Sequence, residues 1–132
     1  MESSILTSTK KVLGIADSYE VFDHDIITNI NSAFSTLAQL GVGPANGFFI
    51  EDKGTDWEEF PVSAVQLAQV RTYVFLKTQL LFDPPTLGFL LDLKQKQIQE
   101  YEWRLSTWRD WENNPVDPMT VVVPADDEEV II

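Results

Sequence analysis

The Asp83-Pro84-Pro85 tripeptide is the feature that most constrains the fold of this chain. Proline lacks a backbone N–H and holds the preceding residue in an extended conformation, so no helix can run through this point. Apolar residues recur at helical spacing on both sides of it. The sequence therefore predicts two helices within residues 62–111, the first ending near Phe82 and the second capped by Thr86.

The second of these helices carries a continuous apolar stripe. Ile98, Tyr101, Leu105 and Trp108 follow one another at steps of three and four residues, which places them on one face. The first helix is apolar over most of its C-terminal half, where we expect Leu81 to be buried. Two such helices form half of a bundle, so the other half must come from the rest of the chain or from a neighbouring subunit.

Length and composition indicate one small domain. The chain has 132 residues, of which 44% are hydrophobic, enough for a modest core. It has no cysteine, which excludes disulfides and thiolate metal sites. No apolar run reaches the roughly 18 to 20 residues that span a bilayer, and the N-terminus lacks the apolar core of a signal peptide, so a cytoplasmic protein is expected.

The net charge of −12 argues against ordinary DNA binding, because affinity for phosphates comes from lysine and arginine. Simple solubility would explain such a charge. So would a surface along which DNA must slide without being held. Composition does not separate these two interpretations.

Two further helices are predicted over residues 5–15 and 25–40. Gly14 and Gly41 are placed to end them, since glycine readily adopts the left-handed conformation that follows a helix. The Lys10-Lys11 pair falls near the end of the first helix, where cations suit the helix dipole.

Polar and aromatic residues around the second predicted helix have expected positions of their own. Asp23 or Asp25 can cap its start. Asn31 is expected on the polar side, away from the apolar stripe. Tyr19 and Phe22, in the preceding linker, are expected to pack against the core.

Residues 43–60 form the predicted connection between the second and third helices. Phe48-Phe49-Ile50 is β-prone and is followed by the turn-prone Glu51-Asp52-Lys53-Gly54. This pattern predicts a short β-hairpin or an ordered loop. Connections of this length in compact domains are often functional.

The segment 113–132 is predicted to be an extended acidic arm. Prolines interrupt it, and the acidic run 126–129 separates two apolar clusters. An all-helical domain offers these clusters no sheet, whereas the edge of a partner's sheet would accept them as an added strand. The candidate partner-binding residues of the arm are Met119, Val121, Val122, Val123, Val130, Ile131 and Ile132.

The sequence gives little support to an enzyme. His24 is the single histidine, and its place beside Asp23 and Asp25 favours a solvated residue at a helix start over a general base. No nucleophile elbow, phosphate-binding glycine loop or zinc motif is present, and the acids at 126–129 lack EF-hand spacing. We therefore predict no catalytic residues, no metal and no cofactor.

Tryptophans gather at the end of the last predicted helix. Helix packing would explain them, and so would a subunit interface, where tryptophan and arginine are enriched. Trp103 lies off the apolar stripe, which favours the interface. The candidate interface residues are Trp103, Arg104, Trp108 and Arg109.

Several of these segments together resemble the head–tail connector, or adaptor, proteins of long-tailed bacteriophages. The most specific are Leu40-Gly41-Val42-Gly43-Pro44 and Leu81-Phe82-Asp83-Pro84-Pro85. They occur in the family's order with Asp25-x-x-Thr28-x-Ile30-Asn31-Ser32-x-Phe34, Tyr73-x-x-x-Lys77 and Glu102-Trp103-Arg104-Leu105.

The resemblance implies a non-enzymatic virion protein, made in the host cytoplasm, that forms a ring of usually twelve copies in the phage neck. The ring would dock beneath the portal protein and extend the DNA channel toward a stopper protein and the tail, without binding DNA specifically. The C-terminal segment, here 113–132, would reach the portal. The loop, here 43–60, would face the channel or the next ring through Phe48, Phe49, Glu51, Asp52 and Trp57.

The expected fold is therefore mainly α: a small bundle of about four helices over residues 1–112, with the inserted loop and the C-terminal arm. One alternative is a small acidic regulatory protein that mimics DNA. Another is a stopper or tail-terminator subunit of the neck, although such subunits are usually rich in β-structure. A hydrolase is the least favoured.

Overall fold

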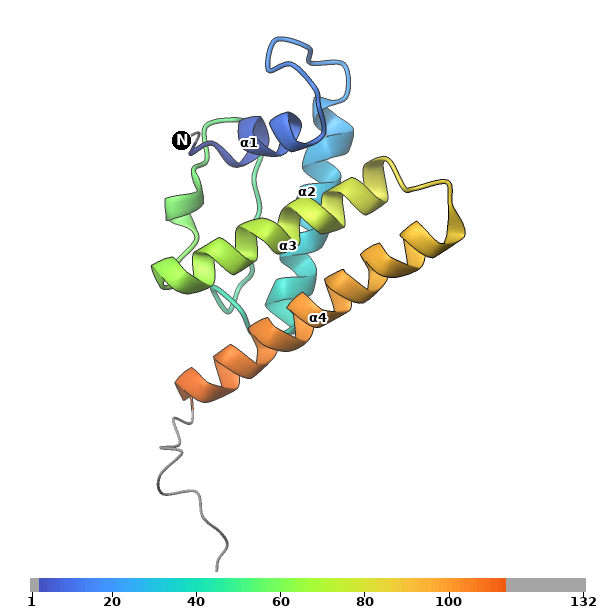
Figure 1. The fold of residues 1–132 in the computed structure, drawn as a ribbon. Coiled ribbons are helices and arrows are strands. Elements are labelled where there is room, and N and C mark those ends of the chain that lie inside the picture. Colours follow the sequence, from blue (N-terminus) through green and yellow to red (C-terminus); the bar gives the residue numbers. More distant parts are fainter. Residues whose placement is uncertain (1–2, 114–132) are drawn as a thin grey trace, which may run out of the picture.

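The computed structural model describes residues 3–113, and the side chains of residues 3–108. It contains four α-helices, α1 (Ile5–Val12), α2 (Asp23–Gln39), α3 (Ala64–Phe82) and α4 (Gly88–Asn113), and one short 3-10 helix, η1 (Trp57–Glu59) (Figure 1). Within this part of the chain there is no strand, only an isolated bridge between Ser4 and Asp56. The mainly α class is confirmed, and the connection over 43–60 is an ordered loop and not a β-hairpin. The predicted arm from residue 114 onward lies outside the described residues.

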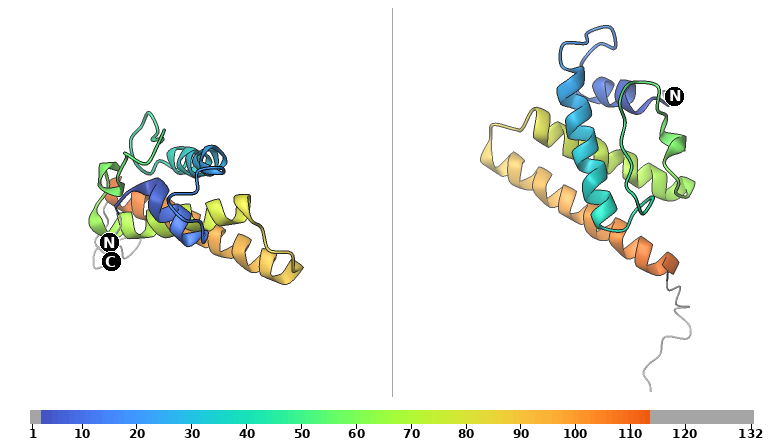
Figure 2. Two further views of the ribbon diagram at one scale, coloured as in Figure 1. Left: turned by 90° about the horizontal axis from the view of Figure 1, so that it is seen from above. Right: turned by 180° about the vertical axis from the view of Figure 1, so that it is seen from behind.

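Helix α3 lies at the centre of the fold. It runs antiparallel to α4 to form a hairpin, and α2 crosses the other side of α3 (Figures 1 and 2). The short helix α1 packs on α2 and α3. Buried apolar side chains from all four helices and from the loop meet between these layers. They are Ile5, Leu6, Ile26, Ile30, Ala33, Phe34, Leu37, Val42, Ile50, Trp57, Phe60, Val70, Tyr73, Val74, Ile98 and Leu105.

Both glycine stops are confirmed. Gly14 and Gly41 have φ angles of 78° and 81°, in the left-handed region. After α2, the N–H of Gly41 donates to Ala38 and that of Val42 donates to Leu37, which is the Schellman arrangement that satisfies the last carbonyls of a helix. The apolar residue after the stop, Val42, is 2% exposed, so it ties the helix end to the core.

The predicted caps of α2 are wrong. Phe22 occupies the N-cap position and makes no capping hydrogen bond with its side chain, while Asp23 and Asp25 lie in the first turn. There their negative charge suits the helix dipole. Asp23 is held by a more distant partner, Lys10.

The hairpin turn follows the proline break. Helix α3 ends at Phe82, as predicted, but α4 begins at Gly88, so Leu87 and not Thr86 precedes its first residue. The stripe on α4 is confirmed, with Ile98 and Leu105 buried. Leu81 was expected in the core but is 45% exposed, because α3 is apolar on nearly every face at this end and periodicity does not indicate which face is buried.

The loop 43–60 is part of the core. Trp57 is 0% exposed, and its indole Nε1 donates to Ser8 Oγ on α1 at 2.8 Å. Asn31 does not face solvent: its side-chain amide donates to the carbonyl of Ile50 (2.9 Å) and accepts from the N–H of the same residue (2.8 Å). This double hydrogen bond imitates one rung of a β-ladder and explains an asparagine in the middle of a helix.

Lys10 fixes the linker between α1 and α2. Its side chain is 1% exposed, and its Nζ donates to the carbonyl oxygens of Asp17 (2.9 Å) and Tyr19 (2.8 Å) and pairs with Asp23 Oδ1 at 2.7 Å. The linker is thereby held outside the core. Tyr19 and Phe22, expected to be packed inward, are 48% and 39% exposed. The ring of Phe22 contacts those of Tyr19 and, at the rim of the fold, Phe82, with centroids 5.8 and 5.5 Å apart.

Candidate interaction surfaces

The residues predicted to form the loop contact separate into two groups. Trp57 is buried and Phe48 is half-buried against the rings of Phe34 and Phe60, so these two side chains stabilise the domain and cannot form an outward contact. Phe49, in contrast, is 65% exposed, and Glu51 and Asp52 are exposed beside it. Of the five predicted contact residues, the loop therefore presents to solvent one aromatic ring and two carboxylates.

An acidic hollow lies where the α1–α2 linker meets this loop. It measures about 290 Å³ and brings together segments far apart in the sequence. Lys53, which also lines the hollow, is the only lysine or arginine between positions 17 and 59. The acidic residues that line the hollow are Asp17, Glu20, Asp23, Glu51 and Asp52.

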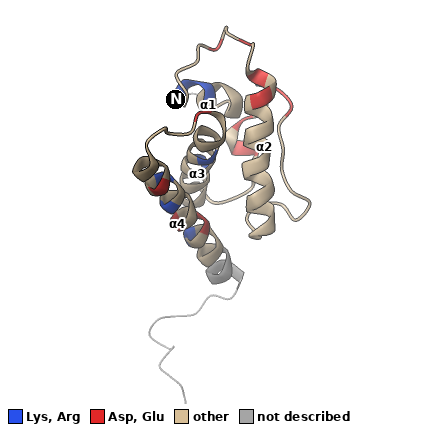
Figure 3. Ribbon diagram, turned by 90° about the vertical axis from the view of Figure 1, so that its right-hand side faces the viewer, with Lys and Arg blue, Asp and Glu red and all other residues tan. Residues whose placement is uncertain are grey.

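Charge is distributed unevenly over the rest of the described chain. Acidic residues gather at the start of α2 and on the linker before it, whereas α2 has no ionisable residue after Asp25 (Figure 3). Along α4, lysines and arginines are interspersed with acidic residues. The excess negative charge of the described domain is therefore concentrated near the acidic hollow. A phosphate backbone approaching that side meets repulsion.

A groove of about 420 Å³ lies between the N-terminal half of α3 and the end of α4. It is lined by Gln69, Trp103, Arg104, Thr107 and Trp108. Three predicted interface residues, Trp103, Arg104 and Trp108, thus lie together, and Trp103 is 66% exposed, as its place off the stripe predicted. The side chain of Arg109 lies outside the described residues.

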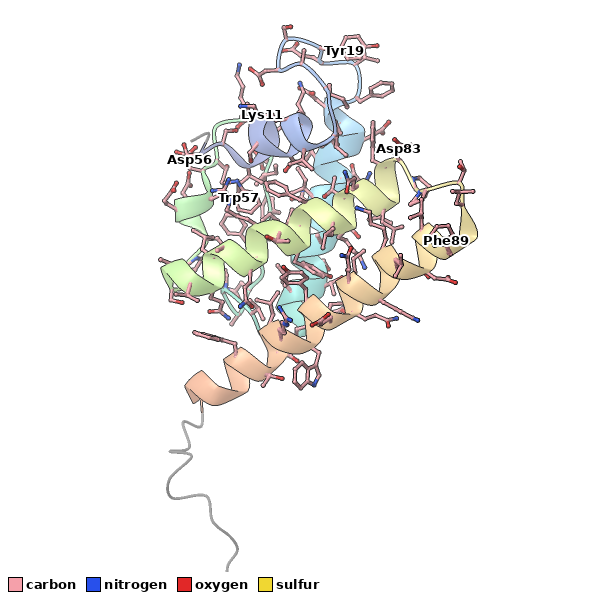
Figure 4. All side chains as sticks on the ribbon, in the orientation of Figure 1. Lys11, Tyr19, Asp56, Trp57, Asp83 and Phe89 are labelled. Atoms are coloured by element: carbon pink, nitrogen blue, oxygen red, sulfur yellow. The ribbon has the colours of Figure 1, made fainter. Side chains whose placement is uncertain are left out.

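The opposite end of the hairpin carries a surface that sequence reasoning missed. We call it the hairpin-end patch. Its members are apolar side chains that are 40% to 64% exposed, and Phe89 and the nearby Asp83 are labelled in Figure 4. The patch consists of Leu81, Leu87, Phe89, Leu90 and Leu93. The available signal was that Phe89, Leu90 and Leu93 do not belong to the Ile98–Trp108 stripe.

A buried tyrosine joins the two helices of the hairpin. The Tyr73 hydroxyl donates to Glu102 Oε2 at 2.8 Å, and Lys77 Nζ lies 3.9 Å from the same oxygen. Burial raises the pKa of Tyr73 well above its ordinary value of about 10, and the hydrogen bond to Glu102 and that carboxylate's charge raise it further, against a smaller opposing effect of Thr36. Tyr73 therefore stays neutral in the folded chain when exposed tyrosines ionise.

This shift predicts an alkaline loss of stability. Below pH ~10 the contribution of Tyr73 is constant, and above it the free energy of unfolding falls by at most about 1.4 kcal/mol per pH unit, because the unfolded chain releases the proton first. Tyr73→Phe should cost about 1 kcal/mol at pH 7 through the lost hydrogen bond and remove this dependence. Urea unfolding between pH 7 and 11 measures both, with Tyr19→Phe as the exposed control. Equal pH slopes in the two variants would contradict the assignment.

The described residues do not gather side chains that could hold a metal ion. His24 is exposed in the first turn of α2, and its backbone carbonyl accepts from Thr28 within the same helix. Despite the many carboxylates, no three potential ligands among residues 3–108 are placed to hold a metal ion. Within the described chain no helix is both long and apolar enough to cross a bilayer.

The family model described as "Phage connector protein" matches residues 5–112, which include the loop, both surfaces of the hairpin and all four helices except the last residue of α4. No curated protein and no solved structure is significantly similar to the chain.

Proposed function

Because the chain belongs to the phage connector protein family, a family of structural virion proteins and not of enzymes, we propose that it is the head–tail adaptor of a long-tailed phage. Twelve copies form a ring beneath the portal protein at the neck. The ring extends the DNA channel toward the stopper and the tail, and DNA passes through it without specific binding.

The uneven charge of the protomer is the observation that supports this proposal best. The acidic hollow and the exposed Glu51 and Asp52 occupy one side, while the hairpin carries balanced charge. With that side toward the channel, a ring multiplies the negative field around the DNA. Screening limits the field to roughly 10 Å, so it acts on DNA in the bore and not on the capsid outside.

The remaining surfaces have roles that fit a ring between two partners. Phe49, beside the acidic hollow, faces the channel or the next ring of the neck. The groove with Trp103, Arg104 and Trp108 belongs to the interface between subunits, together with Arg109. The segment 114–132 reaches the portal and adds its apolar residues, such as Val121 and Ile131, to the edge of a portal sheet.

The absence of strands in residues 3–113 weighs against the stopper and tail-terminator alternatives, which are usually β-rich. A DNA mimic shares the acidic surface, and it differs in assembly. A mimic would be a monomer or dimer that binds a basic DNA-binding protein, whereas an adaptor binds the portal as a ring.

Native mass spectrometry of the full chain with and without portal protein tests the proposal. Protomers of 15.0 kDa should assemble on the portal into a ring of about 180 kDa. A chain that stays a monomer or dimer beside the portal, and binds a basic protein instead, would favour the mimic.

Deletion of residues 114–132 should leave the fold intact and abolish attachment to the portal, because the helices and the loop of the described domain already form a buried core with one another. Circular dichroism measures the first and pull-down by portal protein the second. Val121→Asp in the full chain should lose attachment as well, whereas Asp126→Asn with Asp127→Asn should keep it, since the apolar residues make the contact. Undiminished attachment by the truncated chain would exclude a role of this segment.

A further inference from the structure

We infer that the hairpin-end patch of one copy seats in the α3/α4 groove of the next copy, an assignment that rests on the proposed ring and names its contact. Five exposed apolar side chains, with Phe89 at 64% and Leu87 at 55% exposure, lie within about two turns of the α3–α4 connection. Exposed apolar side chains grouped in this way are typical of a surface that binds another protein.

The groove is the concave counterpart of the patch. It is lined by Trp103, Arg104, Thr107 and Trp108 of α4, with Gln69 from α3. Tryptophan and arginine in a pocket are the residues that most often dominate the binding energy of an interface. The leucine and phenylalanine side chains of the hairpin-end patch are apolar, as are the tryptophan rings of the groove residues.

Geometry requires the contact to lie between two copies. The patch residues lie at the α3–α4 connection and the groove residues near the other end of α4, and these are opposite ends of the hairpin (Figure 1). At 1.5 Å of rise per residue, Phe89 and Thr107 are separated by about 27 Å along α4, far beyond the reach of a side chain. Two different surfaces at opposite ends generate a head-to-tail, heterologous interface, which is the kind that closes into rings.

Charge supports the same pairing. Asp83 and Asp92 are exposed at the hairpin end, and Arg104 stands exposed at the groove, where Glu100 occupies part of its guanidinium at 2.6 Å. A guanidinium has five N–H donors and can accept a second carboxylate. Of the two lysines near the hairpin end, Lys94 is engaged by Gln79 at 2.9 Å, and Lys96 is exposed to solvent.

The natural absence of cysteine allows a direct test by crosslinking. Thr86→Cys marks the hairpin end and Thr107→Cys marks the groove, and both positions are exposed. A mixture of the two full-length variants, treated with a short bismaleimide, should give a covalent heterodimer. The double variant should give a ladder that ends in a closed ring. Phe89→Asp should reduce the product at least tenfold, and Thr28→Cys on α2 replaces Thr86→Cys as the control that should not crosslink.

The outcomes separate this contact from the proposed function. Dominant products within one variant, yields equal to the Thr28→Cys control, or yields unchanged by Phe89→Asp would overturn the contact. A portal-bound ring that gives no crosslink between positions 86 and 107 would overturn the contact and leave the adaptor function standing. A crosslink between these positions in a protein that never attaches to portal would support the contact and overturn the adaptor function. The chain lacking 114–132 should crosslink as well as the full chain, and a loss would assign the groove to that segment.

Discussion

Replacing Lys10 by methionine should lower the free energy of unfolding by about 2–4 kcal/mol, which in a domain of this size lowers Tm by roughly 8–15 °C. Lys10 is buried at 1% exposure, and its Nζ is bound by two carbonyl oxygens and by Asp23. Methionine fills a similar volume and supplies no donor. The two carbonyls and a carboxylate that is only 25% exposed would then lose their shared partner.

Lys11→Met is the matched control for this prediction. The two lysines are neighbours on α1 and undergo the same chemical change, but Lys11 is exposed (labelled in Figure 4). Removal of an exposed charge changes stability by no more than about 0.5 kcal/mol. Thermal unfolding followed by circular dichroism compares them, and equal Tm values would show that the buried ammonium does not hold the domain together.

The consequence of losing Lys10 extends to the surface. The carbonyls that it binds belong to the linker that carries Tyr19, Val21 and Phe22, all exposed. An exposed aromatic linker has little apolar contact of its own to keep it in one conformation. Lys10 therefore positions this linker and one wall of the acidic hollow at once, and the variant should increase proteolysis within residues 13–22 before the domain as a whole unfolds.

Local chemistry accounts for what the sequence predicted well. The Pro84-Pro85 break and the glycine stops act on their own backbone, so their effect needs no knowledge of the fold. The stripe from Ile98 to Trp108 likewise depends only on helical spacing. The place of Trp103 off that stripe predicted its exposure, and it lies in the groove with two other predicted candidates, Arg104 and Trp108.

Long-range partners account for what it did not predict. Trp57 looked like a surface aromatic because its hydrogen-bond partner, Ser8, lies 49 positions away. Asn31 looked solvent-facing because the backbone that it clamps, at Ile50, is 19 positions away. The hairpin-end patch escaped notice for a related reason: an apolar residue predicts burial, and only the packed structure shows which apolar residues remain uncovered.

Gly43→Ala should destabilise the domain by about 2–5 kcal/mol, which makes it the most damaging removal of a glycine in the loop. Gly43 has a φ angle of 90°, where a side chain costs energy in any surroundings. A Cβ built there would lie 2.5 Å from Cζ of Phe60, a residue 2% exposed in the core. The ring cannot retreat freely, because it stacks on Phe34 with centroids 5.3 Å apart and meets Phe48 edge-on at 5.2 Å.

Gly47→Ala separates backbone strain from the clash with Phe60. Gly47 has a φ angle of 86° in the same loop, but its nearest neighbour is Ala38 Cβ, 3.9 Å from the position of an added Cβ. Gly47→Ala should therefore lower the free energy of unfolding only by the strain of a left-handed alanine, about 1–2 kcal/mol. Urea denaturation of both variants gives the difference, and a Gly43→Ala value no larger than that of Gly47→Ala would show that the ring yields. The comparison assigns a physical role to the Leu-Gly-Val-Gly-Pro segment: its first glycine stops α2, and its second lets the loop pass close over the aromatic core, which presents Phe49, Glu51 and Asp52 on the acidic side of the protomer.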